Sequence, residues 1–221
     1  MRGIAFIGGE GPRPEWRRSL CAEVLSGGET LLVAADSGLI AAEAAGLWPD
    51  WVVGDMDSLG DAGLAQLDRY PPERVLRYAA DKDFTDTELA LRLLWEKGCT
   101  ETWLIGGGGG RLDHLLAIRS LFERERCPSR WITAAEDIRC VEAGGNLRAD
   151  VAPPHVVSVF PAGPGPWAAE SEGLKWPLAG LTWDRGFFGV SNAAEAGGFS
   201  VRVKQGRFLV ILPLAAAMAG L

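Results

Sequence analysis

The chain has 221 residues, 48% of them hydrophobic, so it is long enough and apolar enough to bury a core. Its formal net charge is -7, and no segment gathers the lysines and arginines that a nucleic-acid or anionic-membrane surface requires. These features argue against disorder, nucleic-acid binding and membrane binding, and they favour a small-molecule partner.

Up to about residue 136, short apolar runs alternate with helical patterns, which is typical of a parallel sheet with crossover helices. The apolar runs predict strands over residues 3–7, 30–34, 51–53, 75–78, 102–105 and 131–133. Apolar residues at three-and-four spacing predict helices over residues 16–25, 37–45, 86–97 and 113–125. We therefore expect an α/β domain with a layered, Rossmann-like parallel sheet over residues 1–136.

The pattern changes after Asp137. Short β-type segments, separated by glycine and proline, cover residues 138–142, 155–160, 199–204 and 207–212, and no helical pattern interrupts them. We place a domain boundary near residue 136 and predict a small all-β sandwich over residues 138–221.

The cysteines and the two ends of the chain bear on its compartment. No C-x-x-C pair occurs among Cys21, Cys99, Cys127 and Cys140, which argues against a zinc ribbon or a disulfide framework and favours a reducing compartment. The apolar stretch in the first ten residues is too short for a signal peptide, so we expect a cytoplasmic protein. Residues 208–221 are broken by Pro213 and fall short of the ~20 apolar residues of a membrane span. They predict a buried final strand and tail.

Two carboxylates follow the predicted strand 51–53, in the segment Gly54-Asp55-Met56-Asp57-Ser58. Residues two apart on an extended backbone point to the same side. Open α/β sheets bind ligands at the carboxyl ends of their strands, and magnesium prefers oxygen ligands. The pattern predicts a metal site, and the alternative is two solvated acids in a turn with Ser58.

A second acidic segment, residues 81–88, opens a predicted helix. Thr85 and Glu88 fit a capping box, which makes Asp86 the first helical residue. Acids at a helix N-terminus also offset the helix dipole, so this segment has a purely structural explanation as well. Beside the two carboxylates of the preceding motif, Asp86 is a third candidate metal ligand.

Five consecutive glycines, residues 106–110, lie between a predicted strand and a predicted helix. Glycine lets backbone N–H groups approach an anion closely, so we expect a phosphate there, with Arg111 as a bidentate cation. The run is neither a Walker A loop nor the G-x-G-x-x-G of dinucleotide folds, and the alternative is a flexible turn.

Five motifs in this order resemble the thiamine pyrophosphokinase family over essentially the whole chain. They are Ala35-Asp36-Ser37-Gly38, Gly54-Asp55-Met56-Asp57-Ser58, Lys82-Asp83-Phe84-Thr85-Asp86, residues 106–113, and Gly173-Leu174-Lys175-Trp176-Pro177-Leu178. The sequence departs from the family pattern at Ser37 and Ile40, where the family usually has Gly and Asn.

The resemblance implies transfer of a pyrophosphoryl group from magnesium-bound ATP to the hydroxyethyl arm of thiamine. It also implies a homodimer, with each site between the α/β domain of one subunit and the β domain of the other. It assigns the magnesium-phosphate carboxylates to Asp55, Asp57 and Asp86, with Asp36 nearby. It assigns phosphate and substrate contacts to Lys82, Gly107, Gly108, Gly109, Gly110, Arg111 and Asp113, and thiamine contacts to Trp176, Ser191 and Asn192.

Other interpretations stay open at this point. Taken alone, Trp176 would be a β-core tryptophan, and Ser191 with Asn192 an ordinary turn. The proton acceptor is not readable from the sequence, and Asp113 and Asp86 are the candidates. The rival functions are a pyrophosphokinase for another alcohol, such as a pterin, and a non-catalytic sensor of thiamine or nucleotide.

Overall fold

The computed structural model describes residues 1–150, 155–184, 186–194 and 197–218. The chain divides into two compact units. The first unit holds residues 1–118 and 131–134, and the second holds residues 119–130 and 135–221. Residues 119–130 therefore group with the β-rich part of the chain.

A parallel sheet forms the centre of the first unit, in the order β6-β5-β1-β2-β3-β4. Its strands are β1 (Arg2–Phe6), β2 (Thr30–Ala35), β3 (Trp51–Gly54), β4 (Val75–Arg77), β5 (Glu101–Ile105) and β6 (Arg130–Ile132). The pairings of β1 with β2 and β5, of β2 with β3, and of β3 with β4 are all parallel. The predicted α/β fold with a parallel sheet is confirmed.

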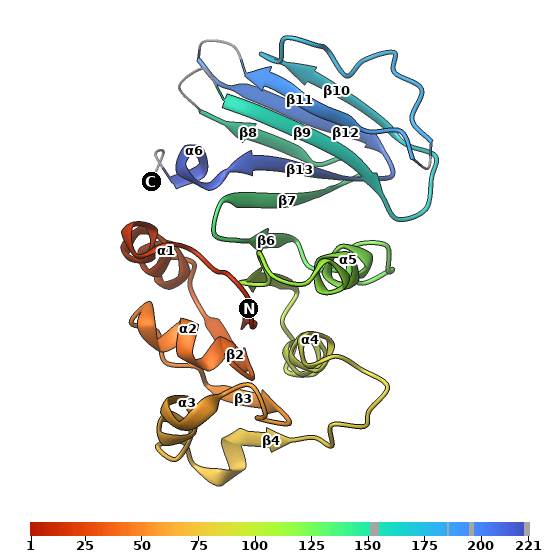
Figure 1. Ribbon diagram of the computed structural model, residues 1–221. Helices are drawn as coiled ribbons and strands as arrows, with labels where there is room; N and C mark the ends of the chain where they lie inside the picture. Colours follow the sequence, from red (N-terminus) through yellow and green to blue (C-terminus); the bar gives the residue numbers. More distant parts are fainter. Residues whose placement is uncertain (151–154, 185, 195–196, 219–221) are drawn as a thin grey trace. The chain divides into compact units, whose positions relative to one another are not determined.

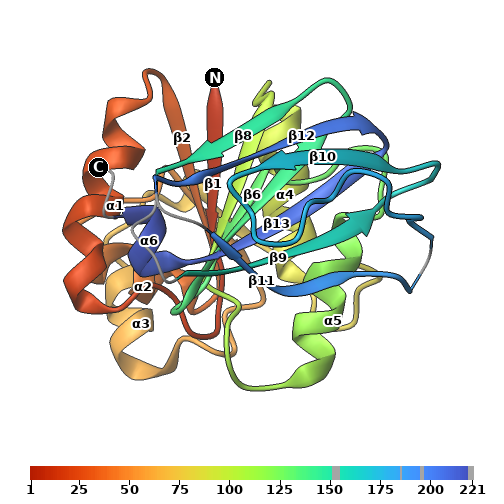
Figure 2. The ribbon, with the colours of Figure 1, turned by 90° about the horizontal axis from the view of Figure 1, so that it is seen from above.

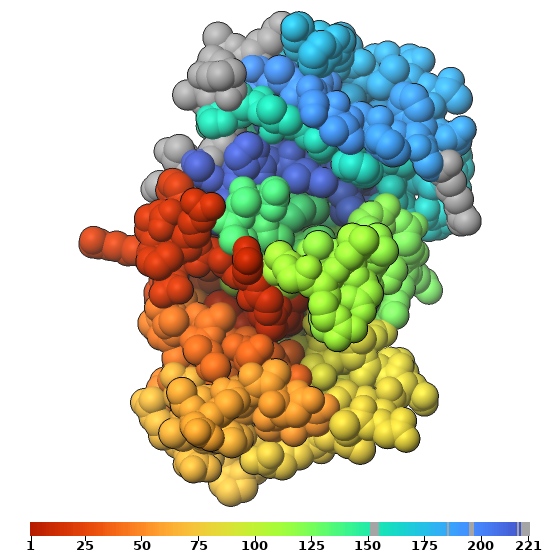
Figure 3. Space-filling model, in the orientation of Figure 1, coloured from red at the N-terminus to blue at the C-terminus, as the bar shows by residue number. Residues whose placement is uncertain are grey.

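Helices cover both faces of this sheet. They are α1 (Pro14–Ser26), α2 (Gly38–Ala44), α3 (Gly60–Leu67), the 3-10 turn η1 (Pro72–Arg74), α4 (Asp86–Glu96) and α5 (Leu112–Leu121). Helices α1, α2 and α3 lie on one face and α4 on the other (Figure 1), and the space-filling view shows α1 to α3 in red to light orange at the surface (Figure 3). The expected capping box opens α4, where Glu88 N–H donates to Thr85 Oγ1 and Thr85 N–H to Glu88.

Helix α3 is absent from the sequence-based prediction because two of its eight residues are glycines, each costing about 1 kcal/mol relative to alanine. Close packing explains the presence of a glycine at position 63. A Cβ at Gly63 would lie 2.9 Å from Leu59 Cβ and 3.2 Å from Ile40 Cδ1. Close contact between α2 and α3 thus accounts for the glycine and for an apolar side chain at position 40.

The second unit consists of two antiparallel sheets, in the orders β11-β9-β13-β7 and β10-β12-β8. The strands are β7 (Glu136–Glu142), β8 (Asn146–Ala149), β9 (His155–Ala162), β10 (Ala168–Glu172), β11 (Gly189–Ala194), β12 (Phe199–Gln205) and β13 (Arg207–Pro213). Figure 2 shows β8, β12 and β10 running side by side.

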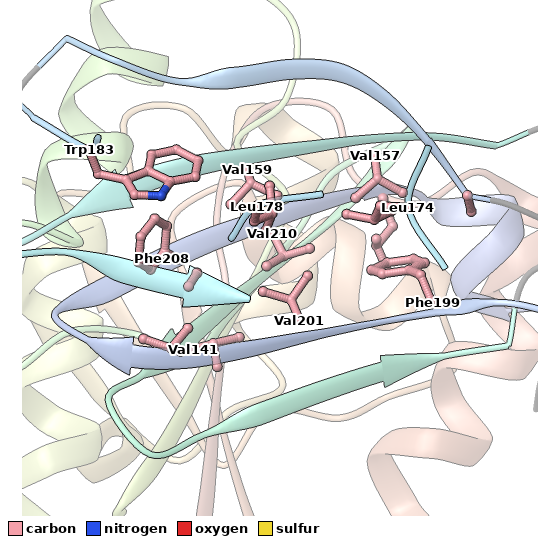
Figure 4. Close-up of a cluster of buried hydrophobic side chains, with 14 residues drawn as sticks. Val141, Val157, Val159, Leu174, Leu178, Trp183, Phe199, Val201, Phe208 and Val210 are labelled. Carbon is pink, nitrogen blue, oxygen red and sulfur yellow. The ribbon is translucent and has the colours of Figure 1, made fainter. Parts of the chain in front are cut away.

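One apolar core joins the two sheets of the second unit (Figure 4). Strand β12 contributes Phe199, Val201 and Val203, and the other sheet contributes side chains from β9, β13 and β7. The long connection from β10 to β11 adds Leu174, Leu178 and Trp183, whose ring packs edge-on against Phe208. The predicted β-sandwich is confirmed.

The end of the chain differs from the expectation of a strand and tail. Strand β13 forms as predicted, but residues after it form a short helix, α6 (Leu214–Met218), and residues 219–221 lie outside the described part. Leu214 N–H donates to Ala135 O at 2.7 Å, which fixes the start of α6. Within the described residues, no helix is both long and apolar enough to cross a membrane.

Arg207 explains why α5 ends at Leu121 instead of residue 125. Its Nη1 donates to Phe122 O at 2.8 Å and to Arg124 O at 2.7 Å, and its Nη2 donates to Glu125 O at 3.2 Å. The last carbonyls of a helix lack partners within the helix, and here a buried guanidinium of β13 satisfies the carbonyls that follow α5. This guanidinium clamp joins two segments of the second unit, residues 119–130 and β13.

Candidate functional site

The candidate site of the first unit lies where the strand order reverses. Strand β1 is central, with β2 on one side and β5 on the other. Connections that leave parallel strands in opposite directions open a crevice at the carboxyl ends of those strands. The loops after β1 and β5 meet at this point, because Gly107 N–H donates to Gly8 O at 2.8 Å.

Acidic side chains gather beside that reversal. Carboxylate oxygens of Asp36, which follows β2, and of Asp55 and Asp57, which follow β3, lie within 4.8 Å of one another. Lys82 Nζ lies 3.3 Å from Asp55 Oδ2 and 3.1 Å from Asp86 Oδ1. The structure therefore brings together the carboxylates and the lysine predicted from three separate sequence motifs, and we call these five residues the acidic cluster.

The expected reason for the Asp55–Asp57 pairing is wrong, although the two carboxylates do come together. The backbone is not extended there, because Met56 has φ 70°. Asp57 N–H folds back and donates to Asp55 Oδ1 at 3.1 Å, and Met56 N–H donates to Asp36 Oδ1 at 3.1 Å. A tight turn anchored on Asp36 thus sets the cluster, rather than the two-residue period of a strand.

The carboxylates of the cluster perturb one another. Burial, together with the neighbouring Asp86 carboxylate, raises the pKa of Asp36 to about 7. The negative charge of Asp55 raises the pKa of Asp57, whereas the Asp57 N–H and the Lys82 ammonium lower the pKa of Asp55. Among the described residues, no donor is aligned on the buried Asp86 Oδ1, despite the nearby lysine. This excess of negative charge and the all-oxygen donor set fit a hard divalent cation.

Gly54 leaves room for the cluster, and Gly54→Ala should disrupt it. Its φ is 138°, and an added Cβ would lie 1.9 Å from Asp36 Oδ1. We expect a loss of about 2 to 4 kcal/mol in the free energy of unfolding, measured by urea titration, because a backbone penalty of ~1–3 kcal/mol adds to the clash.

Gly60→Ala is the matched control, because Gly60 also has a positive φ, 58°, but nothing lies within 4 Å of an added Cβ. It should cost only the backbone penalty of about 1 kcal/mol. Equal losses in the two variants would show that the contact with Asp36 contributes nothing.

The glycine loop after β5 is only partly available to an anion. The N–H groups of Gly107 and Gly108 donate within the protein, to Gly8 O at 2.8 Å and to Glu10 O at 3.0 Å. These two N–H groups are thus already hydrogen-bonded within the protein, and phosphate binding at Gly107 and Gly108 stays a prediction. Gly109 and Gly110 are exposed, and the phosphate prediction rests on them. Sequence analysis missed the role of Gly8 and Glu10, although a glycine pair directly after a strand is a usable signal.

Arg111 and Asp113 open helix α5 as a pair. Arg111 Nε and Nη2 donate to the two Asp113 carboxylate oxygens at 3.1 Å and 2.5 Å, and both side chains are exposed. The Arg111 guanidinium lowers the pKa of Asp113. Asp113 is therefore a poor proton acceptor while it is paired, and it is better placed to orient the guanidinium.

The predicted thiamine residues lie in the second unit, where Asn192 supports Trp176. Asn192 is buried; its Nδ2 donates to Trp176 O at 2.6 Å, and its Oδ1 accepts from Trp176 N–H at 3.1 Å. Trp176 itself is 53% exposed, which rules out a core tryptophan, and Lys175 Nζ lies 4.6 Å from its ring centroid. Ser191 is exposed at φ 59°, in a register shift of β11 rather than a turn.

A family model described as "Thiamin pyrophosphokinase, catalytic domain" matches residues 23–129 of this sequence. Residues 23–129 are therefore similar to the catalytic domain of the thiamin pyrophosphokinase family. The matched segment includes the acidic cluster, the glycine loop, Arg111 and Asp113. Trp176, Ser191 and Asn192 lie beyond it.

Known thiamine pyrophosphokinases resemble the chain in sequence and in fold. The enzyme of Bacillus subtilis (strain 168) is 34% identical over 87 residues, which are 39% of this chain and 40% of that protein. A crystal structure of thiamine pyrophosphokinase from Bacillus subtilis matches with a TM-score of 0.73 at 21% identity, over 96% of this chain and 99% of that chain. The thiamin pyrophosphokinase structure from Candida albicans gives a TM-score of 0.72 at 14% identity, over 96% and 89%. The structural matches show that the shared fold extends through both units.

Proposed function

We propose that this protein is a thiamine pyrophosphokinase, which transfers a pyrophosphoryl group from ATP to the hydroxyl of thiamine and releases AMP. The observation that carries the proposal is the acidic cluster, because it lies within the matched catalytic domain and at the carboxyl edge of the parallel sheet. Phosphoryl transfer depends mainly on positioning and on neutralising phosphate charge, and this edge supplies both carboxylates and cations.

Asp36, Asp55 and Asp57 would hold a magnesium ion, with Asp86 as a further candidate ligand. When bound there, the ion would supply charge neutralisation of the phosphate oxygens. Lys82 holds Asp55 and Asp86 in place through its two ion pairs. Asp36 fixes the turn that carries the other two carboxylates, through its hydrogen bond from Met56.

Arg111 would bind the phosphate groups that the exposed end of the glycine loop admits. Its guanidinium is pre-oriented by Asp113 and stays charged at any physiological pH. A bidentate guanidinium suits the oxygens that gain charge as AMP leaves. Asp86 remains a candidate for accepting the thiamine hydroxyl proton, and the pairing with Arg111 argues against Asp113 in that role.

Trp176 would offer its exposed ring to the cationic thiazolium of thiamine. The ring already carries the Lys175 ammonium over one face, which shows that a cation can occupy such a position. Asn192 holds the backbone of Trp176 through both ends of its amide, so its role would be support rather than direct contact. Ser191 is the exposed polar group on the neighbouring strand.

Trp176→Ala should raise the apparent thiamine KM roughly two- to thirtyfold and leave the ATP KM unchanged, since a cation–π contact contributes ~0.5 to 2 kcal/mol. Steady-state kinetics with each substrate varied in turn measures this. Trp48→Ala is the control, because Trp48 is 48% exposed but belongs to the first unit and stacks on Tyr70. A rise confined to the ATP KM would contradict the thiamine role.

Measuring AMP release from ATP separates the proposed function from its rivals. Release that requires thiamine supports a thiamine pyrophosphokinase, and release only with a pterin alcohol indicates a different acceptor. Binding of thiamine without any AMP release would indicate a sensor.

We further propose a cytoplasmic homodimer in which each site takes its carboxylates from one subunit and Trp176 from the other, as the family resemblance implies.

A further inference from the structure

Two cysteines of the second unit lie side by side although they are 13 positions apart in the sequence. Cys127 lies in the turn that follows α5, and Cys140 lies in β7. Their sulfur atoms are 3.9 Å apart, and both side chains are partly exposed. Cys140 N–H donates to Ser129 O at 2.9 Å, so backbone contacts hold the two segments together.

The Cys140 contact and the Arg207 guanidinium favour a thiolate at Cys127, while burial and the Glu142 carboxylate oppose it. The hydrogen bond with Cys140 and the nearby Arg207 guanidinium lower the pKa of Cys127, whereas the same sulfur contact and burial raise the pKa of Cys140. Arg207 Nε also donates to Glu142 Oε1 at 2.6 Å, and that oxygen lies 4.0 Å from Cys127 Sγ. The pair therefore combines one activated thiol with one protonated thiol in direct contact.

A metal site is the competing interpretation, because Cys127, Cys140 and Glu142 have the spacing of metal ligands. Arg207 opposes it. The guanidinium is ion-paired with the only carboxylate of that trio and adds a positive charge beside both sulfurs. A cation would have to displace this ion pair, whereas thiol chemistry gains from it.

We propose that Cys127 and Cys140 form a reversible thiol–disulfide pair that reacts with low-molecular-weight disulfides. The Cys127 thiolate attacks one sulfur of the external disulfide, forming a mixed disulfide and expelling one thiolate. Cys140 then loses its proton and attacks Cys127 Sγ, which forms the protein disulfide and expels the second thiolate. Two protein thiols are oxidised, and one external disulfide is reduced to two thiols. The sulfurs need to approach by roughly 2 Å to reach bonding distance.

The test uses the reduced full-length protein, incubated with millimolar oxidised glutathione and then quenched in acid. We expect the four free thiols to fall to two and to return to four with dithiothreitol. Cleavage after Arg126, Arg130, Arg139 and Arg148 leaves peptides 127–130 and 140–148, which should appear as one linked species, two hydrogens lighter than their sum.

Cysteine-to-serine variants test which cysteine carries out each step of the exchange. A chain with Cys21→Ser and Cys99→Ser should still form the linked species, because both residues belong to the first unit. Cys140→Ser should keep glutathione attached at Cys127, since no second thiol can expel it. Cys127→Ser should react at Cys140 at least tenfold more slowly. Circular dichroism checks that each variant is folded.

Three results would overturn the proposal. One is retention of all four thiols under these conditions. Another is a glutathione adduct on Cys127 that persists although Cys140 is present. The third is stoichiometric binding of added Zn²⁺ with submicromolar Kd that is lost in the Cys127→Ser and Cys140→Ser chain, which would make the pair a metal site instead.

Discussion

Asp57→Asn is expected to fold normally and to lose about a thousandfold in turnover at saturating magnesium. The Asp57 side chain is exposed, so its charge contributes little to folding, and the substitution removes a hard anionic ligand from the acidic cluster. If charge stabilisation by the metal is worth ~4 kcal/mol, the loss is on the order of a thousandfold. AMP release from ATP and thiamine measures it, and Asp55→Asn should behave similarly.

Asp61→Asn provides the control for that experiment. Asp61 is an exposed acid of α3, only four positions from Asp57, and it lies outside the acidic cluster. The Asp61→Asn variant should retain nearly full activity. Near-normal rates in both Asp55→Asn and Asp57→Asn would remove the metal assignment, whereas loss of the folded circular dichroism signal would point to a structural role.

Mixing two impaired variants, assayed at a thiamine concentration well below the KM of the thiamine-site variant, should restore about a quarter of wild-type activity. One partner is Asp57→Asn, and the other combines Trp176→Ala with Ser191→Ala. In an isologous dimer with shared sites, each mixed dimer has one site with both defects and one site with none. Random exchange makes half of the dimers mixed, and half of the sites in mixed dimers are intact. About a quarter of all sites are therefore intact.

Subunit exchange has to be demonstrated first, by co-purification of tagged and untagged chains. A mixture that has exchanged but stays as inactive as its parents would mean that each site is built within a single chain. The thiamine pyrophosphokinase activity itself would survive that result, because only the sharing of sites would be lost.

The framework of the fold follows from the sequence because it depends on patterns that repeat. Strands β1 to β6 and helices α1, α2, α4 and α5 appear as alternating apolar runs and helical spacings, and their predicted bounds differ mainly at the ends. Strands β8, β10 and β11 escaped prediction because they are short or carry polar residues on exposed faces. Helix α3 escaped because of its glycines.

The candidate site was predictable in composition but not in geometry. Acidic motifs at strand ends indicate which carboxylates gather, since parallel strands end at one edge. Local backbone conformation decides how they gather, and the left-handed turn at Met56 has no sequence signal of its own. The same limit applies to Gly107 and to Asn192, because their polar groups form hydrogen bonds with residues that are distant in the sequence.

The guanidinium clamp of Arg207 also bears on how this protein can be dissected. A fragment cut at the change of sequence pattern near residue 136 would keep the turn after α5 but lose the side chain that binds its carbonyls. Carbonyls that lose these hydrogen bonds would have to find water or other donors, so we expect such a fragment to be less stable than the intact chain. A boundary read from the sequence pattern alone would thus separate Arg207 from carbonyls that belong to the same compact unit.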